Sequence, residues 1–315
     1  PIDDFVDENN ETVILTITST TGGAAIGAPS AATLTIIDND TAGVALSQPS
    51  VTVSEAGPTS ASYSMVLTSQ PTANVTVNLT YGTGADATSD VTFSAASLTF
   101  TAANWNVPQS ITVTAIDDPT VDGTETDEFV SHAISTTAAE YVAAPFSGGG
   151  GAANNEVAIT ITDNDVASVT LSASAVAVAE DAGTDTFTVV LGAQPVGTVT
   201  LVVGYNNGGE AHPTADASAS TGTLVFTPAN WNVAQTVTVT AATDFVVEGP
   251  EVENITITVD TAATSNEFDT PIFNGGGGAA SNEVQVSITD NDVASVAISK
   301  AATGVDETGP TSDSY

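Results

Sequence analysis

Carboxylate side chains recur in this sequence at spacings that could bind a metal ion. Three sets place the second acid four residues and the third acid seven residues after the first: Asp4, Glu8, Glu11; Asp118, Asp122, Glu125; Asp244, Glu248, Glu251. Each set is expected on the loop at the end of a strand. Carboxylates gathered at one end of a domain would repel one another unless they were protonated or bridged by a cation.

The available donors favour calcium among the metals. The chain has no cysteine, and its two histidines, His132 and His212, lie at unmatched positions of an internal repeat, which indicates incidental residues. Calcium takes about six to eight oxygen ligands in flexible geometry, whereas magnesium keeps several waters and uses fewer carboxylates. The alternative is that these Asp and Asn residues form turns and that their charge only aids solubility.

Composition excludes several function classes. The 315 residues include 38 acidic side chains and one Lys or Arg, for a net charge of −37. Nucleic acids and anionic membrane surfaces require Lys and Arg, so neither is an expected partner. The apolar stretches are far shorter than the roughly 18 residues of a spanning helix, so no membrane insertion is expected. An active site is normally unique in a chain, whereas these carboxylates are duplicated, so we predict no enzymatic activity.

The acidic sets belong to a long internal repeat. An Asp-Asn-Asp triplet occurs at 38–40, 163–165 and 290–292, and the segment FTAANWNVPQSITVTA at 100–115 returns at 226–241 as FTPANWNVAQTVTVTA. Self-similarity of this length indicates tandem domains. We therefore predict a window cut from a longer array, which would explain the absence of a start methionine and a signal peptide. It comprises the C-terminal part of a repeat at 1–40, complete repeats at 41–165 and 166–292, and the N-terminal part of another at 293–315.

Period-two alternation predicts short strands throughout each repeat. Val75, Val77, Leu79 and Tyr81 share one face of the first such run. Similar runs occupy 111–115, 157–161, 199–203, 237–239, 255–259 and 284–288. No window sustains a helical period. About seven strands in each repeat, separated by Gly, Pro, Asn and Asp turns, indicate an all-β fold of antiparallel sandwiches.

Four motifs in a fixed order resemble the Calx-β domain. In the repeat at 41–165 they are Val53-Ser54-Glu55-Ala56-Gly57, Asp90, Asp117-Asp118 with Asp122-Gly123-Thr124-Glu125, and Asp163-Asn164-Asp165. The resemblance covers essentially the whole chain and implies tandem immunoglobulin-like sandwiches stabilised by Ca²⁺. It implies these metal ligands: Asp4, Glu8, Glu11, Asp38, Asp40, Glu55, Asp90, Asp118, Asp122, Glu125, Asp163, Asp165, Glu180, Asp216, Asp244, Glu248, Glu251, Asp290 and Asp292.

Two departures from the family pattern reduce the formal charge of the expected sites. The closing triplet has Asn at its centre, and Thr243 replaces the first Asp of the acidic pair in the second complete repeat. Fewer charges imply fewer ions, or weaker binding, than in family members that act as sensors.

We therefore expect an extracellular structural array, such as the stalk, fibre, filament or sheath of a surface adhesin, rigidified by calcium near Asp40, Asp165 and Asp292. Its partners would be neighbouring repeats or copies of the same chain. The alternative is a carbohydrate-binding or adhesive recognition module with a surface glycan or protein target. That reading would use Trp105 and Trp231 as an aromatic platform, but one tryptophan at a fixed place in each repeat is more typical of a core residue.

The glycine runs at 148–151 and 275–278 lack a following Lys-Ser/Thr and do not open a helix, so they are not phosphate-binding loops. Each lies in a long connection that also carries aromatic residues. Two interpretations remain open from the sequence: contact with a neighbouring chain or surface, or packing at a hairpin tip.

Overall fold

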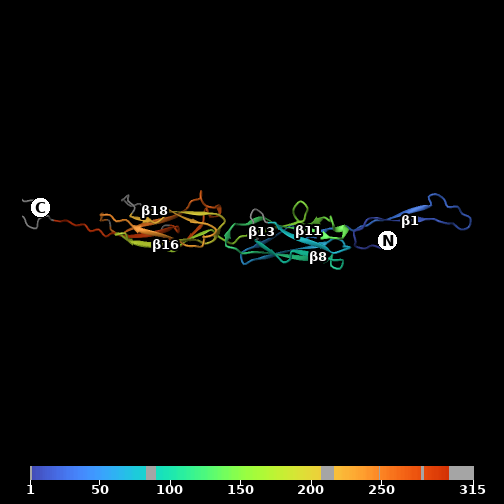
Figure 1. The fold of residues 1–315 in the computed structure, drawn as a ribbon, viewed down its shortest axis with the longest axis horizontal. Coiled ribbons are helices and arrows are strands. Elements are labelled where there is room, and N and C mark those ends of the chain that lie inside the picture. Colours follow the sequence, from blue (N-terminus) through green and yellow to red (C-terminus); the bar gives the residue numbers. More distant parts are fainter. Residues whose placement is uncertain (1, 83–89, 207–215, 248, 278–279, 298–315) are drawn as a thin grey trace, which may run out of the picture. The chain divides into compact units, whose positions relative to one another are not determined.

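The computed structural model describes residues 2–82, 90–206, 216–247, 249–277 and 280–297. These residues form β-strands, turns and two short 3₁₀ helices, η1 (Ala139–Tyr141) and η2 (Asn266–Phe268). In this described part of the chain, no helix has the length and apolarity needed to cross a lipid bilayer. The chain divides into two compact units, Pro1–Asp165 and Val166–Tyr315. Figure 1 shows layered strands within each unit.

The repeat at 41–165 is a sandwich of two five-stranded sheets. One sheet has the order β4 (Ser50–Ser54), β13 (Glu156–Thr162), β11 (Glu125–Thr136), β6 (Val75–Gly82), β8 (Ser97–Phe100). The other has the order β12 (Phe146–Ser147), β3 (Val44–Leu46), β5 (Ser60–Leu67), β9 (Gln109–Ala115), β7 (Val91–Phe93). The short strand β10 (Thr120–Val121) lies in the connection between β9 and β11.

The repeat at 166–292 has the same topology. One sheet has the order β15 (Ala175–Ala179), β24 (Glu283–Thr289), β22 (Glu251–Val259), β18 (Val199–Asn206), β20 (Thr223–Phe226). The other has the order β19 (Ala217–Ala219), β21 (Gln235–Ala241), β16 (Thr184–Leu191), β14 (Ser168–Leu171), β23 (Ile272–Asn274). The short strand β17 (Gln194–Pro195) follows β16.

Alternation of apolar and polar residues places one face of each strand in the core. Val75 and Val77 of β6 are fully buried, and Leu79 and Tyr81 pack against the same core. All the runs predicted as strands are strands in the structure, and the predicted all-β sandwich fold is confirmed. The structure adds one parallel pair at an edge of each five-stranded sheet: β4 with β13, β3 with β12, β15 with β24, and β14 with β23.

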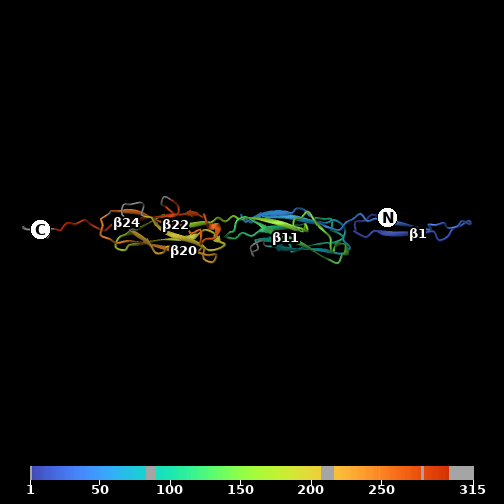
Figure 2. The same cartoon turned by 90° about the horizontal axis from the view of Figure 1, so that it is seen from above.

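The first forty residues contain a hairpin of β1 (Glu11–Thr16) and β2 (Ala31–Ile36), drawn in blue in Figures 1 and 2. Glu11 pairs with Ile36 as Glu251 pairs with Ile288 in the second complete repeat. The hairpin therefore has the register of β22 and β24. Unlike those strands, β1 is exposed along its whole length.

The glycine-rich connections pack on their own repeats. Gly148 and Gly275 both have positive φ angles, +77° and +84°. A Cβ atom at Gly148 would collide with the carbonyl oxygen of Leu46, and one at Gly275 with that of Leu171. Close backbone approach therefore requires glycine at both places, which favours packing within the domain over an exposed contact loop.

The tryptophan of each repeat is partly buried. Trp105 packs against the core of the first complete repeat, and its ring centroid lies 5.9 Å from that of Phe5. Its backbone carbonyl accepts a hydrogen bond from Leu67 N–H at 3.1 Å, and that of Trp231 accepts one from Leu191 N–H at 3.2 Å. The core and ring contacts agree with a packing role for the Trp105 side chain.

A buried pair of polar side chains, Tyr63 and His132, is one of the differences between the two cores. The Tyr63 hydroxyl lies 2.8 Å from His132 Nε2, and His132 Nδ1 lies 2.7 Å from the Asn155 carbonyl oxygen. Burial lowers the pKa of His132, which favours the neutral ring, and both ring nitrogens lie at hydrogen-bond distance from protein atoms. The register places Phe187 and Ile257 at the same two positions of the second complete repeat.

We predict that this pair is energetically coupled. Tyr63→Phe should lower the unfolding free energy by roughly 1 to 3 kcal/mol, because the buried His132 Nε2 loses its partner. Adding His132→Ile, which recreates the apolar pair of the other repeat, should restore much of that loss. Denaturant unfolding of the single and double variants measures the coupling. Strictly additive effects would contradict it.

Candidate metal centres

The first cluster lies at one end of the repeat at 41–165 and joins Glu55, Asp163 and Asp165. Ligand oxygens of these three residues lie within 4.8 Å of one another. Parallel pairing of β4 with β13 places Ser54 beside Thr162, so the next residues, Glu55 and Asp163, emerge at the same sheet end. The Glu55 N–H donates to the Thr162 carbonyl at 3.1 Å, and Glu55 is only 3% exposed.

The loop after β9 supplies further acids to this cluster. Asp163 Oδ2 accepts a hydrogen bond from Gly123 N–H at 2.9 Å, and Asp163 Oδ1 accepts one from Asp165 N–H at 2.6 Å. Asp118 Oδ1 accepts one from Thr120 N–H at 2.7 Å. Backbone donors thus fix the acidic loop and the closing triplet against each other.

Crowding of like charges perturbs these carboxyls. Burial, followed by the negative charges of Asp122 and Asp163, raises the pKa of Glu55 to about 8. Much of the Asp122 residue is exposed, yet partial burial of its carboxyl group, with Asp163 and Asp118 nearby, raises its pKa to about 6. The pKa of Asp165 is also raised, by burial and then by Asp163. The cluster therefore resists full ionisation unless a cation joins it.

The same cluster recurs at 166–292 with Glu180, Asp290 and Asp292. Here β15 runs parallel to β24, which brings Glu180 next to Asp290. Asp290 Oδ2 accepts a hydrogen bond from Gly249 N–H at 2.9 Å, and its Oδ1 accepts one from Asp292 N–H at 2.7 Å. Burial and the charges of Asp290, Asp292 and Asp244 raise the pKa of Glu180.

A second cluster occurs in each repeat and contains a residue that the sequence analysis missed. Its members are Asp90, Glu125 and Glu128 in one repeat and Asp216, Glu251 and Glu253 in the other. The missed residues, Glu128 and Glu253, are each 1% exposed. Burial raises the pKa of Glu253 to about 7. The sequence does contain a clue to these two residues. Each glutamate stands two residues before an apolar residue of an alternating strand, and therefore on the face of the strand that turns to the core.

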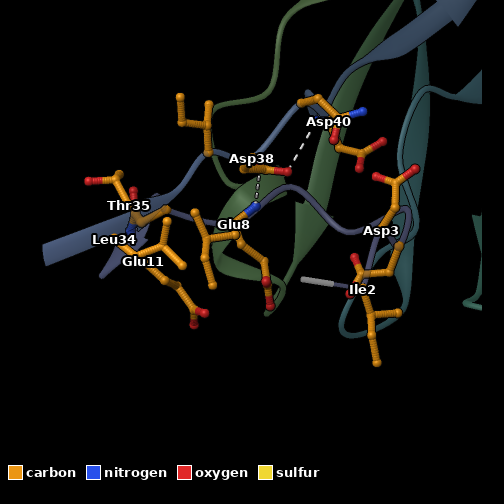
Figure 3. A pocket seen from close by; sticks show the side chains of 13 residues that line it. Ile2, Asp3, Glu8, Glu11, Leu34, Thr35, Asp38 and Asp40 are labelled. Carbon is orange, nitrogen blue, oxygen red and sulfur yellow. Dashed lines mark hydrogen bonds between the residues drawn. The ribbon is translucent and has the colours of Figure 1, made fainter. Parts of the chain in front are cut away.

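The predicted N-terminal residues do not form such a cluster. Among the described residues, no close group of three acids includes Asp4, Glu8, Glu11, Asp38 or Asp40. They line an open pocket of about 400 Å³ beside β1 and β2 (Figure 3). In the complete repeats one carboxylate of the cluster follows a parallel edge strand: Glu55 follows β4, which pairs with β13, and Glu180 follows β15, which pairs with β24. The two-stranded sheet of β1 and β2 has no such parallel strand in the described structure.

Hydrogen bonds to the first Asp of the triplet also organise the N-terminal loop, although the backbone donor from the acidic loop lies one position earlier than in the complete repeats. Asp38 Oδ2 accepts from Glu8 N–H at 2.7 Å, and Asp38 Oδ1 accepts from Asp40 N–H at 3.1 Å. These donors lower the pKa of Asp38, whereas burial and the charge of Asp38 raise that of Asp40. Figure 3 shows the Glu8 and Asp40 bonds to Asp38 as dashed lines. The N-terminal acidic loop is therefore hydrogen-bonded to the closing triplet, but three carboxylates do not come together there.

The remaining predicted residues either lie beside the clusters or are not among the residues that the structure describes. Asp118 and Asp122 act electrostatically on Glu55, and Asp244 acts on Glu180 and Asp292. Glu248 and His212 fall outside the described residues. The central Asn164 of one triplet donates its Nδ2–H to Asp117 Oδ1 at 3.2 Å.

Several buried oxygens make the clusters a suitable fit for a hard cation. Glu55 Oε2 and Asp292 Oδ2 are buried and accept no hydrogen bond from the described residues. A buried carboxylate oxygen without a donor is costly unless it is protonated or binds a cation. All of the clustered donors are carboxylate oxygens, the ligand type that calcium prefers.

Comparison with known families agrees with this donor set. The Calx-beta domain family matches residues 2–40, 38–132 and 162–292. The chain belongs to the Calx-beta domain family. Calx-beta domains are calcium-binding β-sandwich modules, and the acidic clusters of this chain suit the same ion. The matched ranges cover the N-terminal hairpin, the repeat at 41–165 as far as residue 132, and the whole repeat at 166–292.

Solved structures offer more distant likenesses. CBD12 from CALX1.2 is 18% identical, with 70% of this chain and 83% of that chain covered and a TM-score of 0.30. The apo form of the Calx CBD1 domain is 19% identical, with 41% and 100% covered and a TM-score of 0.30. The E. coli chaperone DraB is 12% identical, with 41% and 58% covered and a TM-score of 0.28. TM-scores this low indicate only weak structural similarity. No curated protein sequence matches the chain.

We predict that the calcium-free protein loses stability as the pH rises. The folded pKa of Glu55, about 8, exceeds its ordinary value of 4.5, so the folded state holds a proton that the unfolded state releases. This contribution is complete below about pH 4.5 and is lost as the pH rises through about 8. Thermal unfolding in chelator at several pH values should show a falling melting temperature, with a shallower fall in Glu55→Gln. A rising curve over this window would contradict the assignment.

Proposed function

We propose that this chain is a calcium-rigidified array of structural repeats in an extracellular surface fibre, filament, sheath or adhesin stalk. The observation that carries the proposal is the recurrence of the acidic cluster at the same sheet end of both complete repeats. An active site or a single recognition site would not need this duplication, so we also propose that the chain is not an enzyme. Neighbouring repeats or copies of the same chain are the proposed partners.

The proposed ligands are the carboxylates on the end loops of each domain. In the complete repeats they are Glu55, Asp90, Asp118, Asp122, Glu125, Asp163 and Asp165, and Glu180, Asp216, Asp244, Glu248, Glu251, Asp290 and Asp292. The proposed domains keep the boundaries 1–40, 41–165, 166–292 and 293–315. The closing triplets end the first three of these domains, so a bound ion would order the residues that lead into the next.

Charge neutralisation is the proposed mechanism of rigidity. Without an ion, Glu55, Asp122 and Asp163 repel one another, which favours loosening of the loops that carry them. An ion that binds only the folded state stabilises it by about 2.7 kcal/mol per site at a hundredfold excess over Kd. Extracellular calcium modules function with dissociation constants of about 0.1 to 1 mM, so moderate affinity is sufficient there.

We predict that millimolar calcium raises the melting temperature of the full chain clearly more than magnesium does, compared with chelator. Calcium matches the all-oxygen clusters better than magnesium, which retains its waters. Asp163→Asn with Asp290→Asn should remove most of the calcium-dependent rise. Glu267→Gln is the matched control, because that carboxylate binds Val196 N–H and belongs to no described cluster. An equal response to calcium in all variants would contradict the assignment of these ligands.

We predict that calcium also narrows the range of distances between the two complete repeats. Because the chain has no cysteine, Ser97→Cys and Thr223→Cys provide two unique labelling sites on exposed positions of β8 and β20. Pulsed electron spin resonance should give a narrow distance distribution with calcium and a broad one in chelator. A distribution that does not change would refute rigidification, even if calcium stabilises each domain.

A further inference from the structure

The acidic loops of the N-terminal hairpin and of the second complete repeat each begin with a tight turn. Asp4 Oδ1 accepts a hydrogen bond from Val6 N–H at 3.0 Å, and Asp244 Oδ1 accepts one from Val246 N–H at 2.7 Å. An aspartate that accepts a hydrogen bond from the backbone two residues later forms an Asx turn. The residue in the middle of this turn is a phenylalanine in both loops.

The two phenylalanines differ in exposure. Phe5 is 62% exposed, whereas Phe245 is 95% exposed. The ring centroid of Phe5 lies 5.9 Å from that of Trp105, with the ring planes inclined by 41°, which is within the range of an aromatic contact. Trp105 in turn packs against the core of the repeat at 41–165. The Phe5 ring therefore joins the N-terminal acidic loop to the sandwich that follows it in the chain.

A backbone hydrogen bond fixes Phe5 at the same place. Gln70 N–H donates to the Phe5 carbonyl oxygen at 2.6 Å. The side chain of Gln70 is bonded within the repeat, since its Nε2–H donates to the Ala102 carbonyl at 2.8 Å. Leu67 N–H donates to the Trp105 carbonyl at 3.1 Å. Gln70 and Trp105 thus belong to one hydrogen-bonded end of the sandwich, and together they contact the backbone and the ring of Phe5.

A third contact holds the chain where the repeat at 41–165 begins. Asp7 Oδ2 accepts a hydrogen bond from Ala42 N–H at 2.8 Å, and Ala42 is only 3% exposed. The hydroxyl of Thr68 donates to the Thr41 carbonyl at 2.6 Å. The first two residues of the repeat are therefore bonded on one side to the N-terminal turn and on the other side to their own sandwich.

None of these three contacts requires a metal ion. One joins two aromatic rings, one joins two backbone groups, and one joins a carboxylate to a backbone N–H. The last is a charge-assisted hydrogen bond, which is stronger than a bond between neutral groups. Removal of calcium takes away none of these partners, so we expect the joint at residues 40 and 41 to stay ordered in chelator.

We propose that Trp105 and Gln70 form a docking surface at the end of the repeat at 41–165, and that its occupant is the turn Asp4–Asp7 of the domain before it. The surface recognises an aromatic side chain at the middle of the turn together with the backbone carbonyl of the same residue. It fixes the hairpin on the sandwich without an ion. The inference therefore goes beyond the calcium-dependent rigidity proposed above.

The second complete repeat carries the same surface residues, but the acidic loop before it has a different residue in its turn. Trp231 accepts a hydrogen bond from Leu191 N–H at 3.2 Å, and Gln194 follows Leu191 by three residues, the spacing found in the other repeat. In the acidic loop at 117–125, Pro119 follows Asp118 in place of a phenylalanine. We therefore assign the aromatic contact to the joint at residues 40 and 41 alone.

Distance measurements on the full chain in chelator test the docking surface. Thr35→Cys on the hairpin and Ser97→Cys on β8 place two unique spin labels at exposed positions. Pulsed electron spin resonance should give a narrow distance distribution, which Phe5→Ala should broaden and Phe5→Tyr should keep. Phe245→Ala is the matched control, because it removes the same side chain from the corresponding turn of another repeat. A broad distribution before any change at Phe5, or an equally narrow one in Phe5→Ala, would overturn the proposal.

Tryptophan fluorescence of the unlabelled chain gives a second readout. Removal of the Phe5 ring exposes more of the Trp105 indole to water, so Phe5→Ala should shift the emission to longer wavelength in chelator. Phe245→Ala should leave the emission unchanged. Identical spectra of Phe5→Ala and the unmodified chain would contradict the ring contact on which the docking surface depends.

Failure of the docking surface and failure of the calcium-rigidified array would look different. If the distance between labels at 35 and 97 is broadly distributed in chelator while calcium narrows the distance between labels at 97 and 223, only the docking surface fails. If the first distance is narrow in chelator and depends on Phe5, while calcium leaves the second unchanged, the docking surface stands and the calcium-rigidified array does not.

Discussion

Repulsion between carboxylates held at one sheet end is the constraint on which the rest of this structure depends. Parallel pairing of β4 with β13 and of β15 with β24 forces Glu55 and Glu180 against the acids of the closing triplets. The backbone bonds of Asp163 and Asp290 prevent the loops from relieving this by moving apart. Such an end is stable only when protons or a cation reduce its charge, so the fold is coupled to its ionic surroundings.

Belonging to the Calx-beta domain family accounts for this coupling. An all-oxygen donor set, buried oxygens without donors and raised carboxyl pKa values are three expressions of one charge imbalance. Calcium bound at the loops would neutralise this excess of negative charge, and the proposed rigidity arises there. Within each sandwich, Glu128 or Glu253 places a further carboxyl group at a buried position, only 1% exposed.

Similar sequences do not give equal electrostatics in the three copies of the acidic loop. The N-terminal copy keeps hydrogen bonds to Asp38, yet Asp4, Glu8 and Glu11 stay exposed, and β2 has no parallel strand beside it in the described structure. The two complete repeats also differ in their cores, where Tyr63 and His132 stand in place of Phe187 and Ile257. Repeats that look alike along the chain can therefore differ in their response to pH.

The sequence by itself determined the repeat, the strands and the clustering of acids at strand ends. Alternation fixes which face of a strand is buried, and residues such as Glu55 and Asp163 follow directly on such strands, so these features are local. Only the tertiary structure divided the acids into two clusters per repeat and added Glu128 and Glu253. It also left Asp4, Glu8 and Glu11 unclustered. These outcomes depend on a bulge and on parallel pairing between strands distant in sequence, which no local spacing encodes.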